Sequence, residues 1–134
     1  MKAILDTGPL VALLNKADHH HEWAQQAFAR VQPPLWTCEP VITEASYLTG
    51  RPDAILEMLS KHNLRVGLDL DEESAGVAAL IAKYGKRMDL ADACVVRMSE
   101  LTKRCVVLTV DRSDFSFYRR NGRAVIPLIA PDED

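Results

Sequence analysis

The 134-residue sequence lacks the features that identify several classes of protein. No apolar run approaches the ~18 residues that a membrane-spanning helix requires. The run at residues 1–5 is shorter than the ~7–15 apolar residues of a signal peptide. Low-complexity stretches, internal repeats and Pro- or Gly-rich linkers are also absent from the sequence. We therefore expect a cytoplasmic protein that does not enter a membrane and that folds as one domain over residues 1–134.

Cysteine is scarce, and its pattern excludes two further classes of protein. The three cysteines are Cys38, Cys94 and Cys105, an odd number without any C-x-x-C pair. This pattern matches neither a disulfide framework nor a zinc ribbon. We expect the three side chains to be small buried apolar groups in a reducing compartment.

Charge is nearly balanced over the whole chain but unevenly distributed along it. The net charge of -3 at first suggests that the protein does not bind nucleic acid. Residues 83–123, however, contain ten basic and five acidic residues, a net charge of +5, which leaves -8 for the rest of the chain. A basic region of this kind suits contact with a phosphate backbone.

Short apolar runs alternate with helical patterns along the sequence. We expect strands at 2–5, 35–38, 64–68, 105–110 and 124–128, and helices at 20–31, 40–48, 53–62, 71–84 and 89–103, with a further helix that has Pro9 in its first turn. Strands that alternate with helices predict a parallel sheet in a three-layer α/β domain. In such domains the functional site lies outside the carboxyl ends of the strands.

Two acids stand where that rule places a site. Asp6 follows the apolar run 3–5, and Asp111 follows the run 106–110. Both side chains should project at the carboxyl edge of the sheet. Aspartate is also a favoured helix cap, so capping is an alternative interpretation of each residue.

Three further acids lie in predicted helices. Glu44 is surrounded by apolar residues, although a charge on such a helix usually faces solvent. Asp92 also has apolar neighbours, and an unpaired buried carboxylate is costly. Asp89 precedes it by three residues and shares its helix face. Alternatively, Asp89 is the N-cap and Asp92 lies in the first turn, where the helix dipole favours negative charge.

Several carboxylates cannot all ionise in one low-dielectric site without a cation. A hard divalent ion such as Mg²⁺ is the natural partner of oxygen ligands, and the sequence offers no competing set of Cys and His ligands. A metal held in this way suits phosphoryl transfer, because it lowers the pKa of an attacking water and neutralises charge on the phosphate.

The acids fall in four segments that resemble the PIN domain family and, within it, the VapC-type toxins of type II toxin–antitoxin systems. The segments are ILDTGPLVALLN at 4–15, VITEASYL at 41–48, MDLADACVV at 88–96 and VLTVDRSDF at 107–115. Each is a weak signal alone, but the four occur in the family's order and together span nearly the whole chain. The resemblance implies a three-layer α/β/α fold around a parallel sheet, which agrees with the pattern of strands and helices.

The resemblance also implies a set of catalytic residues. The acidic quartet that binds Mg²⁺ or Mn²⁺ and cleaves single-stranded RNA would be Asp6, Glu44, Asp92 and Asp111. Asp89 would be an additional ligand, and Asp114, Thr7 and Thr109 would support the ligands from behind. The two threonine hydroxyls have an alternative role in satisfying loop backbone groups. Products would carry 5′-phosphate and 3′-hydroxyl ends.

The function implied is that of a metal-dependent endoribonuclease, the toxin of a VapBC-type pair that a cognate antitoxin inhibits and that forms a homodimer. Alternatives are a PIN nuclease in RNA processing and a catalytically inactive PIN binding module. A phosphatase or receiver domain with Asp6 as phosphoacceptor is disfavoured, because the haloacid-dehalogenase pattern requires a second Asp where Gly8 stands.

Two arginines adjoin the acidic segments, and three histidines lie nearby. We expect Arg87 and Arg112 to contact RNA, with an ordinary solvated surface as the alternative. The histidines at 19–21 cannot all face one ion on a helix, because neighbouring side chains point ~100° apart. They are interpreted as a solvated helix start, of which one ring could lie near the site.

Overall fold

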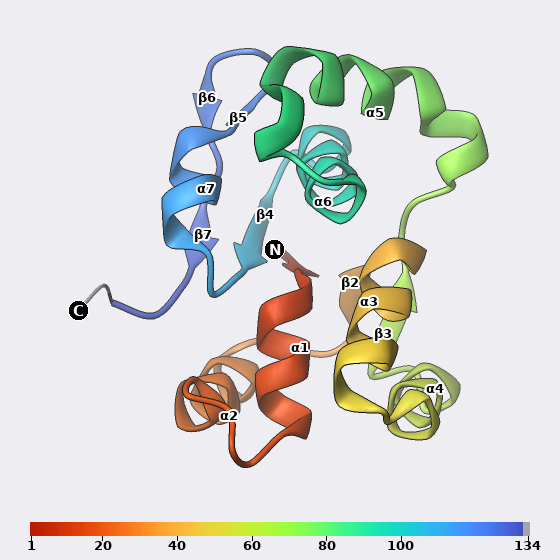
Figure 1. The fold of residues 1–134 in the computed structure, drawn as a ribbon, viewed down its shortest axis with the longest axis vertical. Coiled ribbons are helices and arrows are strands. Elements are labelled where there is room, and N and C mark those ends of the chain that lie inside the picture. The colour runs from red at the N-terminus through yellow and green to blue at the C-terminus, as the bar shows by residue number, and fades with distance from the viewer. Residues whose placement is uncertain (133–134) are drawn as a thin grey trace.

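The computed structural model of the protein describes residues 1–132 and contains a five-stranded parallel sheet (Figure 1). The strands are β1 (Lys2–Leu5), β2 (Leu35–Thr37), β3 (Leu64–Val66), β4 (Cys105–Leu108) and β7 (Leu128–Ile129). Their spatial order is β3-β2-β1-β4-β7. β1 and β4 pair over four residues, from Lys2 with Cys105 to Leu5 with Leu108.

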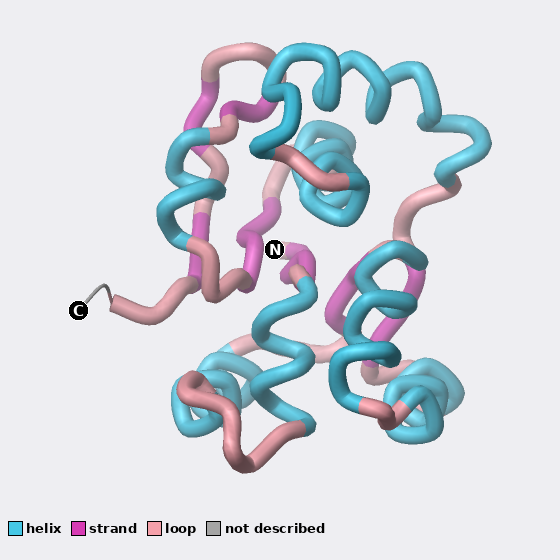
Figure 2. The backbone as a smooth tube through the Cα atoms, in the orientation of Figure 1, coloured by secondary structure: helices cyan, strands magenta, loops and turns pink. Residues whose placement is uncertain are grey.

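Helices cover both faces of the sheet. They are α1 (Thr7–Leu14), α2 (His21–Arg30), α3 (Glu39–Thr49), α4 (Pro52–Ser60), α5 (Leu70–Tyr84), α6 (Leu90–Leu101) and α7 (Arg112–Phe117), with a 3₁₀ turn, η1 (Gly85–Arg87), before α6. In Figure 1, α5 and α6 lie above the sheet and α1 and α2 lie below it. Figure 2 distinguishes these elements from the loops that join them. The predicted three-layer α/β/α fold with a parallel sheet is therefore confirmed.

The core lies where β1, β4 and α6 meet. The side chains of Ile4, Leu5, Val107 and Leu108 are fully buried, as expected for unbroken apolar strands covered on both faces. The three cysteines are buried free thiols, as predicted. No helix within residues 1–132 is both long and apolar enough to cross a lipid bilayer.

The carboxyl-terminal part of the chain corrects two expectations. The single strand predicted at 124–128 is wrong: Ala124–Val125 (β6) pairs antiparallel with Arg119–Arg120 (β5), and only β7 joins the main sheet. The three residues 121–123 join the two strands: Asn121 and Gly122 both adopt positive φ, and the Arg123 backbone N–H donates to the Arg120 carbonyl at 3.3 Å. Helix α7 was not predicted, because its six residues are too few for a clear helical period.

The order of the strands places a switch point beside β1. The chain builds outward from β1 through β2 to β3 and then returns to form β4 on the other side of β1. In open parallel sheets, the carboxyl ends of the two strands at such a reversal enclose the usual ligand crevice. The loops after β1 and β4, which carry the predicted acids, meet at this point.

Candidate functional site

A cleft of about 450 Å³ opens at this switch point. Its walls come from the loops after β1 and β4, from α3, from η1 and from the N-terminus of α6. Eight of the ten residues predicted for the site line it: Asp6, Thr7, Glu44, Arg87, Asp89, Asp92, Asp111 and Asp114. The fold thus brings together acids that are widely separated in the sequence.

Asp6 lies at the bottom of the acidic set and is fixed by Thr109. Asp6 occupies the N-cap position of α1 but makes no capping hydrogen bond with its side chain. Instead, its Oδ2 accepts a 2.8 Å hydrogen bond from the buried Thr109 hydroxyl. The Thr109 oxygen in turn accepts the backbone N–H of Asp111 at 3.0 Å. One hydroxyl therefore couples the loop after β1 to the loop after β4.

The N-terminus of α6 supplies two acids. Asp89 is the N-cap residue, and its carboxylate accepts the backbone N–H of Asp92 at 2.8 Å, so the capping interpretation of Asp89 is correct. The Asp92 carboxylate is partly buried in the first turn, and its Oδ2 lies 3.0 Å from the Tyr118 hydroxyl. Both acids also line the cleft, so capping and a place at the site are compatible.

Helix α7 positions Asp111 and Asp114. Asp111 caps the helix by accepting the Asp114 backbone N–H at 3.0 Å. The Asp114 carboxylate pairs with Arg87, whose Nε lies 2.7 Å away. The Arg87 guanidinium also stacks on Phe117, 4.0 Å from the ring centroid. This basic side chain is therefore held in place at the rim of the cleft.

The remaining predicted residues lie at the margins of the cleft. Glu44 is exposed on α3, so its carboxylate faces solvent at the mouth of the cleft. Arg112 does not line the cleft: its guanidinium donates to the carbonyls of Ala130, at 2.9 Å, and Pro131, at 3.2 Å. Among the histidines, His20 lines the cleft, and Nδ1 of His21 lies 2.7 Å from the Ala12 carbonyl.

Burial and mutual repulsion disfavour ionisation of three of the acids. Burial, opposed by the Thr109 hydrogen bond and reinforced by Asp89 and Asp111, raises the pKa of Asp6 to about 6. Burial, with Asp89 and Asp6, raises the pKa of Asp92 to about 7. Burial also raises the pKa of Asp111. A cation bound among these carboxylates would stabilise their ionised forms, because it offsets both the loss of water and the mutual repulsion.

Gly8 allows the loops after β1 and β4 to approach each other. A Cβ atom at Gly8 would lie 2.3 Å from Cγ2 of Val110, well inside contact distance. Any larger residue would require the Val110 side chain, or the loop that carries it, to shift. No sequence pattern indicated this role for Gly8, because the contact exists only in the folded chain.

The site is chemically suited to a hydrated divalent cation. Within residues 1–132, no three carboxylate, imidazole or thiol groups converge into a complete ligand cage. Mg²⁺, however, usually keeps several waters and binds one or two carboxylates together with substrate phosphates. The Thr7 hydroxyl, beside Asp6 in the cleft wall, is buried without a hydrogen-bond partner in the described part of the chain. The oxygen donors and this unpartnered hydroxyl fit such an ion.

Sequence reasoning missed two side chains that shape the site. Lys86 lines the cleft next to Arg87 and adds positive charge to its rim. The hydroxyl of the buried Tyr118 lies 3.0 Å from Oδ2 of Asp92, although 26 residues separate the two in the sequence. The charge excess of residues 83–123 included Lys86 without distinguishing it, and no local pattern indicated a role for Tyr118.

Comparison with known proteins gives one family match. The model of the family described as PIN domain matches residues 3–121, most of the chain. The match covers all four acidic segments and every residue predicted for the site. No curated protein matches the chain.

Proposed function

The chain belongs to the PIN domain family, whose members are generally nucleases, and on this premise we propose that the protein is a metal-dependent endoribonuclease that cleaves single-stranded RNA. One observation carries the proposal. Asp6, Asp92 and Asp111 converge in one cleft at the carboxyl ends of β1 and β4, where burial raises the pKa of each carboxyl. This arrangement favours a bound cation over the empty site.

In this proposal the acids divide the work of binding and orientation. Asp6, Asp92 and Asp111 would hold Mg²⁺ or Mn²⁺ through their oxygens, directly or through water. The ion, when bound, lowers the pKa of an attacking water and neutralises charge on the phosphate. Glu44, exposed at the mouth of the cleft, completes the site and orients that water. Asp89, the N-cap residue three positions before Asp92, is an additional ligand.

Other side chains support the acids and the substrate. Thr109 fixes the Asp6 carboxylate, and Asp114 holds Arg87 at the rim. Arg87 and Lys86 attract the phosphate backbone, whose affinity for proteins is dominated by such charges. Thr7 supplies a hydroxyl beside Asp6, and Arg112 anchors α7 to the segment after β7 while adding to the basic surface.

Single substitutions in the quartet test the nuclease. We expect the wild-type protein to cleave single-stranded RNA with Mg²⁺ and not with excess EDTA. D6N and D92N should each lower the rate at least about 100-fold, a loss of about 2.7 kcal/mol of transition-state stabilisation. The matched control is D53N, which changes an exposed aspartate paired with Arg51 on α4 and should leave the rate unchanged. Undiminished cleavage by folded D6N and D92N would contradict the assignment.

We further propose that the nuclease is the toxin of a VapBC-type pair, with a cognate antitoxin and a homodimeric assembly. The resemblance of the four acidic segments to VapC-type toxins supports this proposal. Expression of the wild-type chain should arrest bacterial growth, expression of D92N should not, and the product of a small adjacent upstream gene should restore growth. If the wild-type protein cleaves RNA but does not arrest growth, an RNA-processing nuclease is favoured. If it does neither, an inactive binding module is favoured.

A further inference from the structure

Tyr118 contacts the acidic cleft from the protein interior. Its side chain is fully buried, and its hydroxyl lies 3.0 Å from Oδ2 of Asp92 and 2.9 Å from the carbonyl oxygen of Arg87. The hydroxyl has one proton to donate. An ionised carboxylate is the stronger acceptor of the two, so the bond to Asp92 dominates when Asp92 is charged.

The Tyr118 ring is rigidly held. It makes edge-to-face contacts with Tyr84 and Phe115, with ring centroids 5.0 and 5.3 Å away. Its backbone N–H donates to the carbonyl of Asp114 at 2.9 Å, at the C-terminal end of α7. The position of the hydroxyl is therefore determined by the same helix that carries Asp111 at its other end.

We propose that Tyr118 is a positioning residue whose hydroxyl fixes the orientation of the Asp92 carboxylate for cation binding. The hydrogen bond occupies Oδ2 and leaves Oδ1 for the ion. It also ties the first turn of α6 to α7, so that Asp92 and Asp111 keep a constant separation. This inference rests on the proposed metal-dependent nuclease and assigns to it a residue outside the four acidic segments.

The expected consequence is a change in metal affinity. Residues that hydrogen-bond to metal ligands typically alter metal affinity or activity about 10- to 100-fold when they are changed. Y118F keeps the ring and removes only the hydroxyl, so the aromatic contacts remain. We therefore expect Y118F to bind Mn²⁺ about 10- to 100-fold more weakly than the wild-type protein.

The chain offers a closely matched control. Tyr84 belongs to the same aromatic cluster, but its hydroxyl accepts the backbone N–H of Arg119 at 2.8 Å rather than contacting an acid. Y84F thus removes a comparable hydroxyl without touching the cleft. Affinity for Mn²⁺ alone, without RNA, should be measured by electron paramagnetic resonance for the wild-type protein, Y118F, Y84F and D6N.

The outcomes separate this inference from the proposed function. Weak binding by Y118F with wild-type binding by Y84F supports the positioning role. Wild-type affinity in Y118F, or equal losses of affinity in Y118F and Y84F, overturns the positioning role. If D6N loses Mn²⁺ binding in the same experiment, the proposed metal site is still supported. Absence of Mn²⁺ binding by the wild-type protein contradicts the proposed function and, with it, the inference.

A second measurement keeps Tyr118 in place, in case Y118F does not fold. The chain has three tyrosines, so ¹³Cζ-labelled tyrosine gives three NMR signals, which Y47F and Y84F assign. Addition of Mg²⁺ should shift the Tyr118 signal over the concentration range in which the ion binds. Tyr84, whose hydroxyl accepts the backbone N–H of Arg119, is the internal reference that should not shift. A Tyr118 signal that stays unchanged when Mg²⁺ is bound overturns the positioning role.

Discussion

Asp6 is the only acidic side chain that is buried within residues 1–132. Burial removes water from the carboxylate and raises its pKa to about 6, and the Thr109 hydrogen bond offsets only part of this effect. The protonated form is therefore favoured in the folded, metal-free protein relative to the unfolded chain. This acid lowers stability at neutral pH, as expected for a group retained for binding rather than for folding.

The pH dependence of stability should reveal this effect. Because the pKa of Asp6 rises from 3.8 in the unfolded chain to about 6 in the folded protein, its stabilising contribution is complete below pH 4 and is lost as the pH rises through 6. The loss corresponds to about 3 kcal/mol. Asp92 acts in the same direction up to about pH 7. We expect the free energy of unfolding of the metal-free protein to decrease from pH 4 to 7, measured by urea denaturation in EDTA.

D6N is the variant that isolates this contribution. Asparagine cannot ionise, so the decrease in stability between pH 4 and 7 should be smaller in D6N, and the variant should be more stable than the wild-type protein at pH 7. Added Mg²⁺ should stabilise the wild-type protein at pH 7 and have little effect on D6N, since a ligand stabilises the state that binds it. If the free energy of unfolding depends on pH equally in the two proteins, the pKa of Asp6 is not raised by folding.

For single residues, the sequence predicts the acids and the supporting Thr109 hydroxyl, but not the contacts of Gly8 and Tyr118. Asp6 and Asp111 were predictable because each follows an apolar strand, and the carboxyl ends of parallel strands meet at one edge. Asp89 and Asp92 were predictable from their three-residue spacing. The roles of Gly8 and Tyr118 depend on contacts with Val110 and Asp92, which only the folded chain brings within reach.

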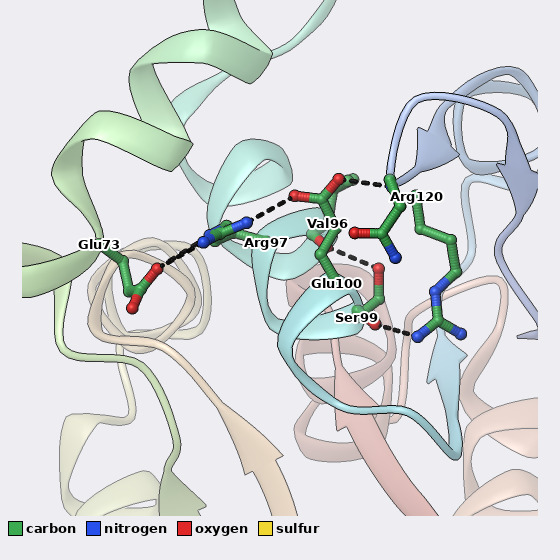
Figure 3. Close-up of polar contacts among 7 residues, drawn as sticks. Glu73, Val96, Arg97, Ser99, Glu100 and Arg120 are labelled. Atoms are coloured by element: carbon green, nitrogen blue, oxygen red, sulfur yellow. Dashed lines mark hydrogen bonds and ion pairs between the residues drawn. The ribbon is translucent and has the colours of Figure 1, made fainter.

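At the scale of elements, α6 is fixed at both ends. Its N-terminus carries Asp89 and Asp92, while Arg97, further along, joins it to α5 through Glu73 at 2.9 Å (Figure 3). Arg97 also pairs with Glu100 at 3.2 Å, and Glu100 accepts the backbone N–H of Asn121 in the β5–β6 turn at 2.6 Å. The side chain of Arg120 reaches the Ser99 and Thr102 carbonyls at the end of α6. These contacts hold α6 in register with the rest of the domain.

Gly76 leaves space for the Arg97 side chain of this network. We therefore expect the substitution G76A to change stability in opposite directions in the wild-type protein and in R97A. Alanine in place of glycine within a helix usually stabilises it by about 0.5–1 kcal/mol. A Cβ atom at Gly76, however, would lie 2.6 Å from Nε of Arg97 and displace its guanidinium. We expect G76A to lower stability by about 1 kcal/mol in the wild-type protein and to raise it by about 0.5 kcal/mol in R97A. Thermal denaturation of the four variants measures the cycle, and a stabilising G76A in the wild-type background would contradict the packing argument.

The predictable elements were those with a clear period and length. Helices α5 and α6 lie within two residues of their predicted bounds, because each has a capping aspartate and a long pattern of apolar residues. The β5–β6 hairpin had a signal, the Asn121-Gly122 pair, that the apolar pattern of 124–128 obscured. No local pattern in the sequence indicates which strands pair with each other. The order β3-β2-β1-β4-β7 is therefore known only from the structure.

For the whole molecule, the structure brings part of the basic region of the sequence next to the acidic cleft. The rim of the acidic cleft includes Lys86 and Arg87 from the basic region 83–123. A divalent ion in the cleft would offset part of the negative charge that gives the chain its net value of -3. The surface that the proposed RNA substrate would meet is then more positive than the overall composition suggests.

Salt dependence of RNA binding tests this charge arrangement. We expect R87Q, made in the cleavage-deficient D92N protein, to bind single-stranded RNA more weakly and to reduce the slope of log affinity against log salt by about 0.7, the value for one phosphate contact on a single strand. R51Q is the matched control, because Arg51 is also an exposed arginine paired with one aspartate but is the N-cap residue of α4 and does not line the cleft. Equal slopes for R87Q and R51Q would exclude a phosphate contact by Arg87.

The ends of the RNA products test most directly whether the acidic cleft hydrolyses RNA with a metal ion. Attack by water that breaks the P–O3′ bond, with the 3′-oxygen leaving, gives 5′-phosphate and 3′-hydroxyl ends and does not require the ribose 2′-hydroxyl at the cleaved position. We expect the wild-type protein with Mg²⁺ to produce these ends and to cleave an RNA that carries one 2′-deoxynucleotide at the mapped site. Products that end in 2′,3′-cyclic phosphate, or loss of cleavage at the 2′-deoxy position, would show attack by the RNA itself and contradict the proposed mechanism.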